Sequence, residues 1–186
     1  MHNKYGLIVG RFQPLHLGHC EIIDQALEMC NRVVIFIGSS QESRTFRNPF
    51  TYEERESLIK KCYHDYYCGG RIRIYPLPDI GVGNNPTWGD YIINRFKVLF
   101  NQEPNVYFTG NEPIRDNWFA NYPKMTQVHI GKRIEVSATQ VRHNMLMHYN
   151  YYTNEFVGDK QNLMRALPIN RIEVDMLSSL CRTYWE

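Results

Sequence analysis

The sequence lacks three features, and each absence excludes a class of protein. No stretch approaches the roughly 18 consecutive apolar residues of a membrane-spanning helix, so no membrane association is expected. The net charge is only +2, from 21 Lys and Arg against 19 Asp and Glu, whereas broad binding to nucleic acid needs a strong basic surplus. The five cysteines form no Cys-x-x-Cys pair and are odd in number, which favours reduced thiols over a disulfide framework.

The sequence also lacks linkers and repeats. Its 186 residues contain no Gly/Ser linker and no internal repeat, and 43% of them are hydrophobic, as in an ordinary globular protein. We therefore expect one domain over residues 1–148 and a helical C-terminal extension over 149–186 that packs on it. The first residues do not form a charged-then-apolar signal. Together with the cysteine pattern, this predicts a cytoplasmic protein.

Apolar runs and helical patterns alternate along the chain. Strands are expected at 5–10, 32–38, 72–75, 106–109 and 126–130, and helices at 18–31, 52–64 and 90–100. This alternation predicts an α/β fold, with a parallel sheet of five or slightly more strands and helices on both faces. In such sheets a ligand binds at the carboxyl ends of the strands, where the strand order reverses. Residues that follow strands are therefore the candidates for chemistry.

The first such segment lies between the first strand and the first helix, and it reads Gly10-Arg11-Phe12-Gln13-Pro14-Leu15-His16-Leu17-Gly18-His19. Two histidines flank a glycine at a helix start, where unpaired N–H groups and the helix dipole attract anions. Arg11 adds a guanidinium suited to a polyphosphate. Two other interpretations are that His16 and His19 only cap the helix, or that they bind a metal together with Cys20.

Four later segments also follow predicted strands. Residues 38–55 form a loop rich in hydroxyl groups and arginine, which either closes over a phosphate or lies in solvent. Residues 78–88 end at Trp88, a ring that either stacks on a charged pyridine or anchors the next helix. Residues 107–111 end in Thr-Gly-Asn, and residues 134–142 contain Ser137 as a candidate N-cap. Arginine outnumbers lysine 14 to 7, which favours anionic ligands.

These motifs resemble those of a known superfamily. His16-Leu17-Gly18-His19 resembles the first signature of the nucleotidyltransferases that share a fold with class I aminoacyl-tRNA synthetases. The preceding string from Gly10 to Pro14 narrows the resemblance to nicotinamide-nucleotide adenylyltransferases of the archaeal type. Residues 136–142 resemble the second signature, with Val136 in place of isoleucine. The resemblance covers about residues 5–145 and implies a Rossmann-like domain.

The resemblance also implies roles for individual residues. A catalytic role in holding the ATP phosphates is implied for His16, His19, Arg47 and Arg142. No residue is assigned as a metal ligand. Arg44 stands where the family often has histidine, and Arg55, inside a predicted helix, is interpreted as a structural ion-pair residue. Binding of the nucleotide substrates is implied for a larger set: Gly10, Arg11, Phe12, Gly18, Asn84, Asn85, Trp88, Thr109, Gly110, Asn111, Arg115, Ser137 and Thr139.

The implied reaction is transfer of AMP from ATP to nicotinamide mononucleotide, with nicotinate mononucleotide as a further acceptor. The products are NAD and pyrophosphate, and Mg²⁺ enters with ATP. A homo-oligomer is expected, as in the archaeal-type relatives. Two alternatives stand beside this hypothesis. One is an adenylyl- or cytidylyltransferase with another phosphorylated acceptor, and the other is a non-catalytic regulator that binds NAD or ATP.

Overall fold

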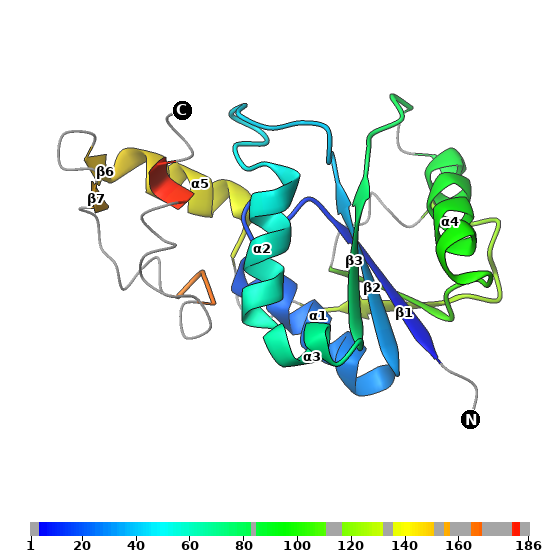
Figure 1. The fold of residues 1–186 in the computed structure, drawn as a ribbon. Coiled ribbons are helices and arrows are strands. Elements are labelled where there is room, and N and C mark those ends of the chain that lie inside the picture. Colours follow the sequence, from blue (N-terminus) through cyan, green and yellow to red (C-terminus); the bar gives the residue numbers. More distant parts are fainter. Residues whose placement is uncertain are drawn as a thin grey trace.

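A computed structural model describes residues 4–82, 85–110, 117–131, 136–150, 155–156, 165–168 and 180–182 of the chain. Strands and helices alternate through most of this range (Figure 1). The strands of the main sheet are β1 (Tyr5–Gly10), β2 (Arg32–Gly38), β3 (Ile72–Leu77), β4 (Val106–Gly110) and β5 (Thr126–Ile130). The helices are α1 (Leu17–Met29), α2 (Tyr52–Cys62), α3 (His64–Cys68), α4 (Pro86–Phe100) and α5 (Ala138–Met147).

All five strands of this sheet run parallel, in the order β3-β2-β1-β4-β5. The central strand β1 places Ile8 between Ile35 of β2 and Phe108 of β4. The chain steps outward from β1 to β3 and then returns to the other side of β1 with β4. The strand order therefore reverses between β1 and β4, and the predicted α/β sheet with five strands is confirmed.

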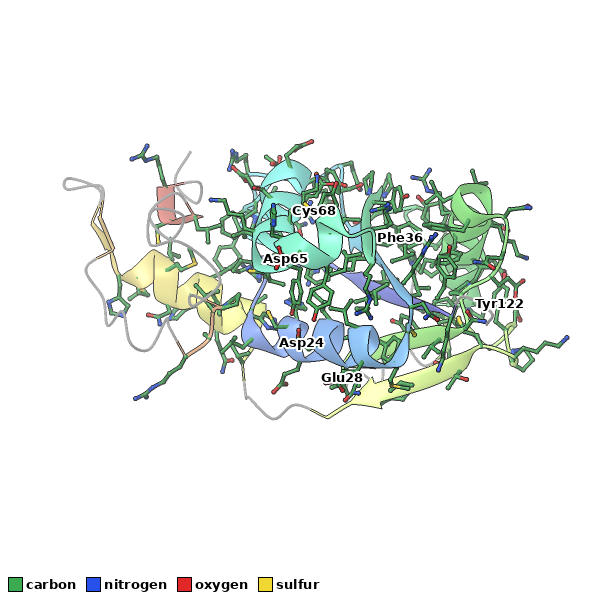
Figure 2. The ribbon with its side chains drawn as sticks, turned by 60° about the horizontal axis from the view of Figure 1, so that its bottom comes forward. Asp24, Glu28, Phe36, Asp65, Cys68 and Tyr122 are labelled. Carbon is green, nitrogen blue, oxygen red and sulfur yellow. The ribbon has the colours of Figure 1, made fainter. Side chains whose placement is uncertain are left out.

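Helices cover both faces of the sheet, as expected from buried parallel strands. Ile8 and its neighbours pack against α1 and α2, whereas Leu7 and Val9, which point the other way, pack against α4. Figure 2 shows Phe36 within the packed interior and Glu28 on α1, and the burial of these residues agrees: Phe36 is fully buried and Glu28 is exposed.

Several element boundaries differ from the sequence prediction: α1 is Leu17–Met29 rather than 18–31, β4 extends to Gly110, and three further differences have a physical reason. Helix α4 begins at Pro86 rather than at residue 90, because Asn85 caps it and a proline is well suited to the first helical position. The helix predicted over 52–64 ends at Cys62, and a separate short helix, α3, follows. Strand β3 continues through Pro76, which is tolerated because β3 lies at the edge of the sheet.

The described part of the C-terminal extension also departs from the prediction. Two short antiparallel strands, β6 (Tyr149–Asn150) and β7 (Glu155–Phe156), lie where helix was expected. Leu167, Leu180 and Cys181 are buried in the same core cluster as α1. These residues therefore pack on the main domain, while a boundary at 148/149 stays a prediction. Among the described helices, none is long and apolar enough to cross a membrane.

Candidate active site

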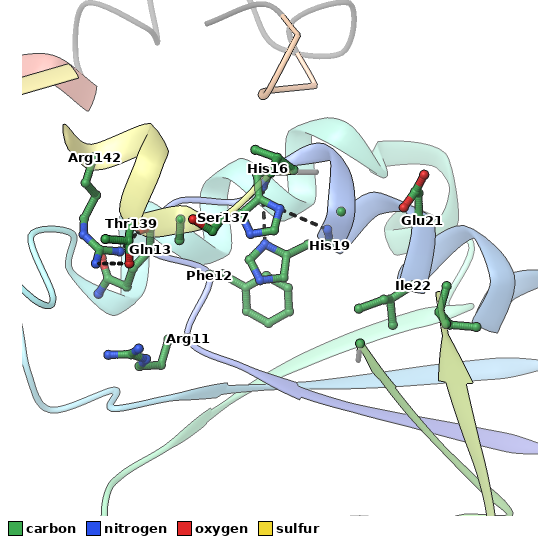
Figure 3. Close-up of a pocket in the computed structure, with 15 residues that line it drawn as sticks. Arg11, Phe12, Gln13, His16, His19, Glu21, Ile22, Ser137, Thr139 and Arg142 are labelled. Carbon is green, nitrogen blue, oxygen red and sulfur yellow. Dashed lines mark hydrogen bonds between the residues drawn. The ribbon is translucent and has the colours of Figure 1, made fainter. Parts of the chain in front are cut away.

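A cavity of about 190 Å³ opens at the carboxyl ends of β1 and β4, where the strand order reverses (Figure 3). Its wall combines the loop after β1, the start of α1, the ends of β4 and β5, and the start of α5. The lining residues are Arg11, Phe12, Gln13, His16, Gly18, His19, Glu21, Ile22, Gly110, Ile130, Val136, Ser137, Ala138, Thr139 and Arg142. The two signatures, more than 100 residues apart in the sequence, thus share one cavity.

His16 and His19 hold each other in place at the start of α1. The Nδ1 atom of His16 accepts the backbone N–H of His19, and Nδ1 of His19 accepts the backbone N–H of His16, both at 3.3 Å. The two rings stack with centroids 3.7 Å apart. A neutral imidazole that accepts at Nδ1 carries its proton on Nε2. Each ring therefore has an N–H donor at Nε2 without needing a positive charge.

Gly18 and Phe12 complete the surroundings of this histidine pair. A Cβ at residue 18 would lie 3.3 Å from the His16 ring, so glycine leaves room for that ring. Phe12 is buried with φ 52°, a left-handed conformation that costs a non-glycine residue energy. Its ring packs at 4.6 Å against the His19 ring. A Cβ at Gly10 would come within 3.0 Å of the same Phe12 ring. The left-handed conformation of Phe12 thus places its ring against His19, and this contact helps to orient the His19 ring.

Arg142 links the second signature to the first. Its Nη1 donates to the carbonyl of Gln13 at 2.7 Å, and its Nη2 donates to Oγ1 of Thr139 at 3.2 Å. Ser137 caps α5, because its hydroxyl accepts the N–H of Gln140. These contacts place a guanidinium, Arg142, and a helix N-terminus at the same cavity as Arg11, and both favour anions. Glu21 is the one carboxylate among the described residues that line the cavity.

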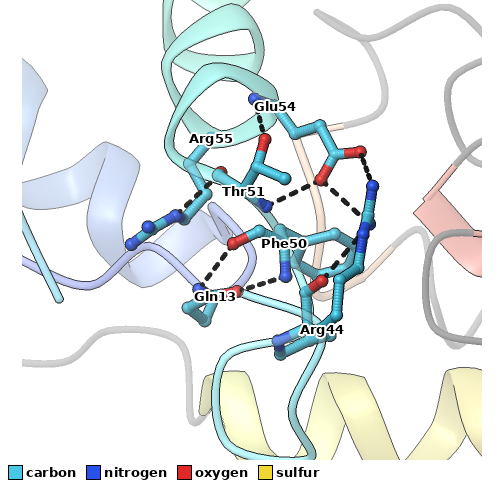
Figure 4. Close-up of polar contacts among 7 residues, drawn as sticks. Gln13, Arg44, Phe50, Thr51, Glu54 and Arg55 are labelled. Carbon is cyan, nitrogen blue, oxygen red and sulfur yellow. Dashed lines mark hydrogen bonds and ion pairs between the residues drawn. The ribbon is translucent and has the colours of Figure 1, made fainter. Parts of the chain in front are cut away.

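The loop after β2 is tied to this site by polar contacts (Figure 4). The Gln13 side chain donates to the carbonyl of Phe50 and accepts its N–H, both at 3.0 Å. Arg44 forms an ion pair with Glu54 of α2 at 3.1 Å and donates to the carbonyl of Pro49 in its own loop at 3.4 Å. It therefore links the two ends of the loop and attaches the loop to α2. Arg47 is exposed on the same loop and does not line the cavity.

Arg55 differs from its sequence interpretation. It is fully buried, and the described structure gives it four backbone carbonyls as hydrogen-bond acceptors rather than a carboxylate: those of Thr51, Arg11, Gly38 and Ser39. Burial lowers the pKa of its guanidinium to about 10, with smaller contributions from Arg11, which also lowers it, and from nearby carboxylates, which raise it. It remains charged at neutral pH. The ion-pair interpretation is therefore wrong, because the acceptors come from loop backbone.

Trp88 lies in the first turn of α4, not at the end of a loop. Its ring stacks on Trp118 with centroids 5.6 Å apart, and its indole N–H donates to the carbonyl of Val82 at 3.2 Å. It is half-buried and belongs to the core layer on the α4 face. The side chain of Asn85 accepts the N–H of Thr87 and so caps α4.

The structure brings nine of the seventeen predicted site residues into the cavity: Arg11, Phe12, His16, Gly18, His19, Gly110, Ser137, Thr139 and Arg142. Gly10, Arg47, Asn85, Trp88 and Thr109 are described but lie outside its lining. The remaining three, Asn84, Asn111 and Arg115, lie outside the described residues.

Six residues of the lining were not among the predicted site residues: Gln13, Glu21, Ile22, Ile130, Val136 and Ala138. Gln13 lay within the string that carried the resemblance, but nothing in the sequence indicated that its amide pairs with Phe50. Glu21 lies three residues after Gly18 and Ile22 three residues after His19, a spacing that puts each pair on one face of the helix and could have included them.

Comparison with known proteins decides the family. The model of the cytidylyltransferase-like family matches residues 7–144, which is most of the chain. The chain belongs to the cytidylyltransferase-like family. Both signature segments of this family member lie within the match, and so do α1 and the start of α5.

Curated relatives of this cytidylyltransferase-like chain include two archaeal proteins named nicotinamide-nucleotide adenylyltransferase. The Saccharolobus solfataricus protein is 43% identical over 105 aligned residues, and the match covers 54% of this chain and 60% of that protein. The Thermococcus kodakarensis protein is 36% identical over 145 residues, which make up 77% of this chain and 73% of that protein. The resemblance to the archaeal-type family, inferred from the motifs, is confirmed.

A solved structure shares the fold of this family member. It is a bifunctional NMN adenylyltransferase/ADP ribose pyrophosphatase from Francisella tularensis, complexed with AMP and a Mn ion. The TM-score is 0.67 at 21% identity, and the match covers 98% of this chain and 52% of that one. The Rossmann-like fold implied by the resemblance is therefore confirmed.

Proposed function

We propose that the protein transfers AMP from ATP to the 5′-phosphate of nicotinamide mononucleotide, giving NAD and pyrophosphate. One observation supports the proposal above all. A single cavity, at the point where the strand order of the sheet reverses, is lined by two histidines and two arginines: His16, His19, Arg11 and Arg142. Two neutral N–H donors and two guanidinium groups suit a triphosphate better than any uncharged ligand. The names of the archaeal relatives support the same reaction.

The acceptor phosphate is itself a competent nucleophile, so the reaction requires no general base and no covalent intermediate. Catalysis then consists of placing the two substrates in line and stabilising charge on the α-phosphate and the leaving pyrophosphate. His16 and His19 donate from Nε2 to these phosphates. Arg142 and Arg47 hold the triphosphate, and Ser137 and Thr139 contribute at the start of α5.

The pyridine ring of the acceptor is placed near the start of α4 in this proposal. Trp88 offers a half-buried indole that is already supported from one side by Trp118. A supported aromatic ring loses little freedom when a charged pyridine stacks on it. Asn85, which caps α4, belongs to the same proposed subsite. Gly10, Thr109 and Gly110, at the carboxyl ends of β1 and β4, are proposed to contact the nucleotide.

Mg²⁺ enters this proposal as part of the ATP complex. The cavity lining contains one carboxylate among the described residues, Glu21, and otherwise nitrogen and hydroxyl donors. Such a donor set suits phosphate oxygens rather than a cation, so Mg²⁺ would take its ligands mainly from phosphate and water. A cytoplasmic location and a homo-oligomer stay predictions from the sequence.

The decisive experiment measures pyrophosphate release with a panel of acceptors. ATP is supplied with nicotinamide mononucleotide, nicotinate mononucleotide, FMN or phosphopantetheine, and CTP with glycerol 3-phosphate. We expect turnover with ATP and a pyridine mononucleotide. The ratio of the turnover rates with nicotinamide mononucleotide and nicotinate mononucleotide shows whether the enzyme prefers the amide or the acid. Turnover only with another acceptor would support the first alternative, and nucleotide binding without turnover would support the regulator.

A further inference from the structure

Arg55 contacts the two loops that leave the sheet beside the cavity. Its Nη1 donates to the carbonyl of Arg11 at 2.9 Å and to that of Gly38 at 2.8 Å, and its Nη2 donates to the carbonyl of Ser39 at 3.1 Å. Arg11 follows β1 and Gly38 ends β2. One guanidinium thus joins the carboxyl ends of two neighbouring strands.

These carbonyls flank the two strained turns of the site. Phe12, directly after Arg11, has φ 52°, and Ser39, directly after Gly38, has φ 47°. Left-handed backbone at residues other than glycine persists only where the surroundings hold it in place. The carbonyl of Arg11 belongs to the peptide that precedes Phe12. The hydrogen bond from Arg55 fixes the orientation of this peptide and therefore of the turn at Phe12. The Arg11 side chain reaches the cavity from this turn.

The charge on Arg55 adds to the positive character of the site. Its hydrogen bonds within the described structure go to neutral carbonyls, and Arg11 is one of the charges that lower its pKa. A buried cation that keeps its charge beside a second cation is stabilised when an anion binds nearby. Removing the Arg55 guanidinium would therefore have two effects: it would loosen the turns at Phe12 and Ser39, and it would reduce the electrostatic attraction of the site for phosphate.

We propose that Arg55 is a positioning residue for the nucleotide phosphates: it holds the turns at Phe12 and Ser39 and thereby sets the direction of Arg11 and of the loop that carries Arg47. The inference rests on the proposed function for the identity of the anion, ATP. It concerns a residue that lies outside the cavity lining.

The test compares Arg55→Lys and Arg55→Met with a matched control, Leu58→Ala. Lysine keeps the charge but cannot reach both turns with one planar group, and methionine removes the charge and the donors. Leu58 is buried in the core on the same helix, one turn later, and its aliphatic side chain donates no hydrogen bond to the loop carbonyls. The readouts are KM for ATP and kcat at saturating acceptor, the melting temperature, and its rise when ATP is added.

A positioning role and a merely structural role predict different kinetics. A structural defect lowers the fraction of active protein, so kcat falls while KM for ATP stays constant. Mispositioned phosphate loops instead raise KM for ATP, and we expect about a tenfold rise for Arg55→Lys and a larger one for Arg55→Met. The ATP-induced rise in melting temperature should shrink in both variants and persist in Leu58→Ala.

The inference is overturned if both variants keep KM for ATP within about twofold of wild type, or if Leu58→Ala raises it as much. It is also overturned if neither variant folds in the presence of ATP, because Arg55 would then be a folding determinant. A wild-type protein with no turnover and no ATP-induced stabilisation would instead overturn the proposed function, so the two failures are distinguishable.

Discussion

Each histidine of the first signature serves the fold and the chemistry with a different ring nitrogen. Nδ1 accepts a backbone N–H and so completes the start of α1, which leaves Nε2 as the donor. The interpretation of His16 and His19 as helix caps and their interpretation as phosphate donors are therefore compatible. Substitution at either position removes a cap together with a donor, and an experiment has to separate the two effects.

Replacing His19 by alanine should lower turnover by about 10²–10³, the usual effect of removing one donor to developing charge. The lost cap should also cost about 1 kcal/mol of stability. The measurements are initial rates of pyrophosphate release and the free energy of unfolding from urea titration.

Tyr63→Phe provides the control for this variant. It removes the hydroxyl that donates to Asp24 and to the carbonyl of Cys20 on the same helix, so it loosens α1 without touching either histidine. Its turnover should stay near that of wild type at a comparable loss of stability. A His19→Ala enzyme that retains turnover within about threefold would contradict the donor role.

The sequence predicted the residues of the cavity better than their local contacts. Ser137 was predicted as a cap because the preference for hydroxyl residues at helix starts is a local effect, and that prediction is confirmed. The partners of Arg55 were not predictable, because Arg11 and Gly38 reach it only after three segments have packed together. Non-local backbone acceptors leave no spacing signal in the sequence.

At the scale of elements, α4 approaches its neighbouring loop unusually closely. A Cβ placed on Gly89 would lie 1.7 Å from the carbonyl oxygen of Trp118 and 2.6 Å from its carbonyl carbon. Such contact with backbone cannot be relieved by turning a side chain. Glycine at position 89 therefore sets the distance at which Trp88 and Trp118 stack.

Gly89→Ala should destabilise the protein by about 3 kcal/mol, the upper part of the range for overpacking. The sign is informative, because alanine in a helix interior is otherwise favoured over glycine by about 1 kcal/mol. Chemical denaturation followed by tryptophan fluorescence measures both the stability and the environment of the tryptophan pair.

Thr87→Ala is the matched control on the same helix, since Thr87 is exposed. It should change the free energy of unfolding by less than about 0.5 kcal/mol. An equal or higher stability of Gly89→Ala than of wild type would show that α4 can move away from Trp118 at little cost.

The boundaries of α4 show why element ends were harder to predict than element order. Residues 76–89 contain three prolines and several glycines, a composition typical of a loop. Yet Asn85 and Pro86 form a favourable helix start, so Trp88 is helical. The succession of strands and helices along the chain was predictable from the alternation of apolar runs and helical patterns. The start of this helix, in contrast, depends on a single capping residue, Asn85.

At the scale of the whole molecule, the five cysteines lie in different parts of the fold and differ in how far they are buried. Cys20, Cys30 and Cys181 are buried, Cys62 is half-buried, and Cys68 is exposed on α3. Burial raises the pKa of the Cys181 thiol to about 12, and burial also raises that of Cys30. Since the thiolate is the reactive form, a raised pKa slows the reaction with thiol reagents at a given pH.

At pH 8, an aromatic disulfide reagent should react rapidly with one thiol per chain in the native protein, that of Cys68, and more slowly with Cys62. The other three should react only when denaturant unfolds the core. Absorbance of the released thiolate measures the count, and Cys68→Ser should abolish the rapid phase. Rapid labelling of Cys181, identified by peptide mass, would show that the C-terminal extension does not stay packed on the domain.

The hydrogen bonds that complete the cavity have a consequence for the order of events during synthesis. The loop after β1 is translated before the groups that complete it, because Arg142 donates to the carbonyl of Gln13 across 129 residues and the N–H of Leu17 donates to the carbonyl of Ala166. A nascent chain that ends before α5 contains Phe12 and the Phe50 backbone that pairs with Gln13, but it lacks the Arg142 guanidinium that binds the Gln13 carbonyl. The phosphate site therefore matures late, after the sheet beneath it has been translated. ATP binding should therefore require a chain translated through α5, whereas burial of the β1–β3 core should not.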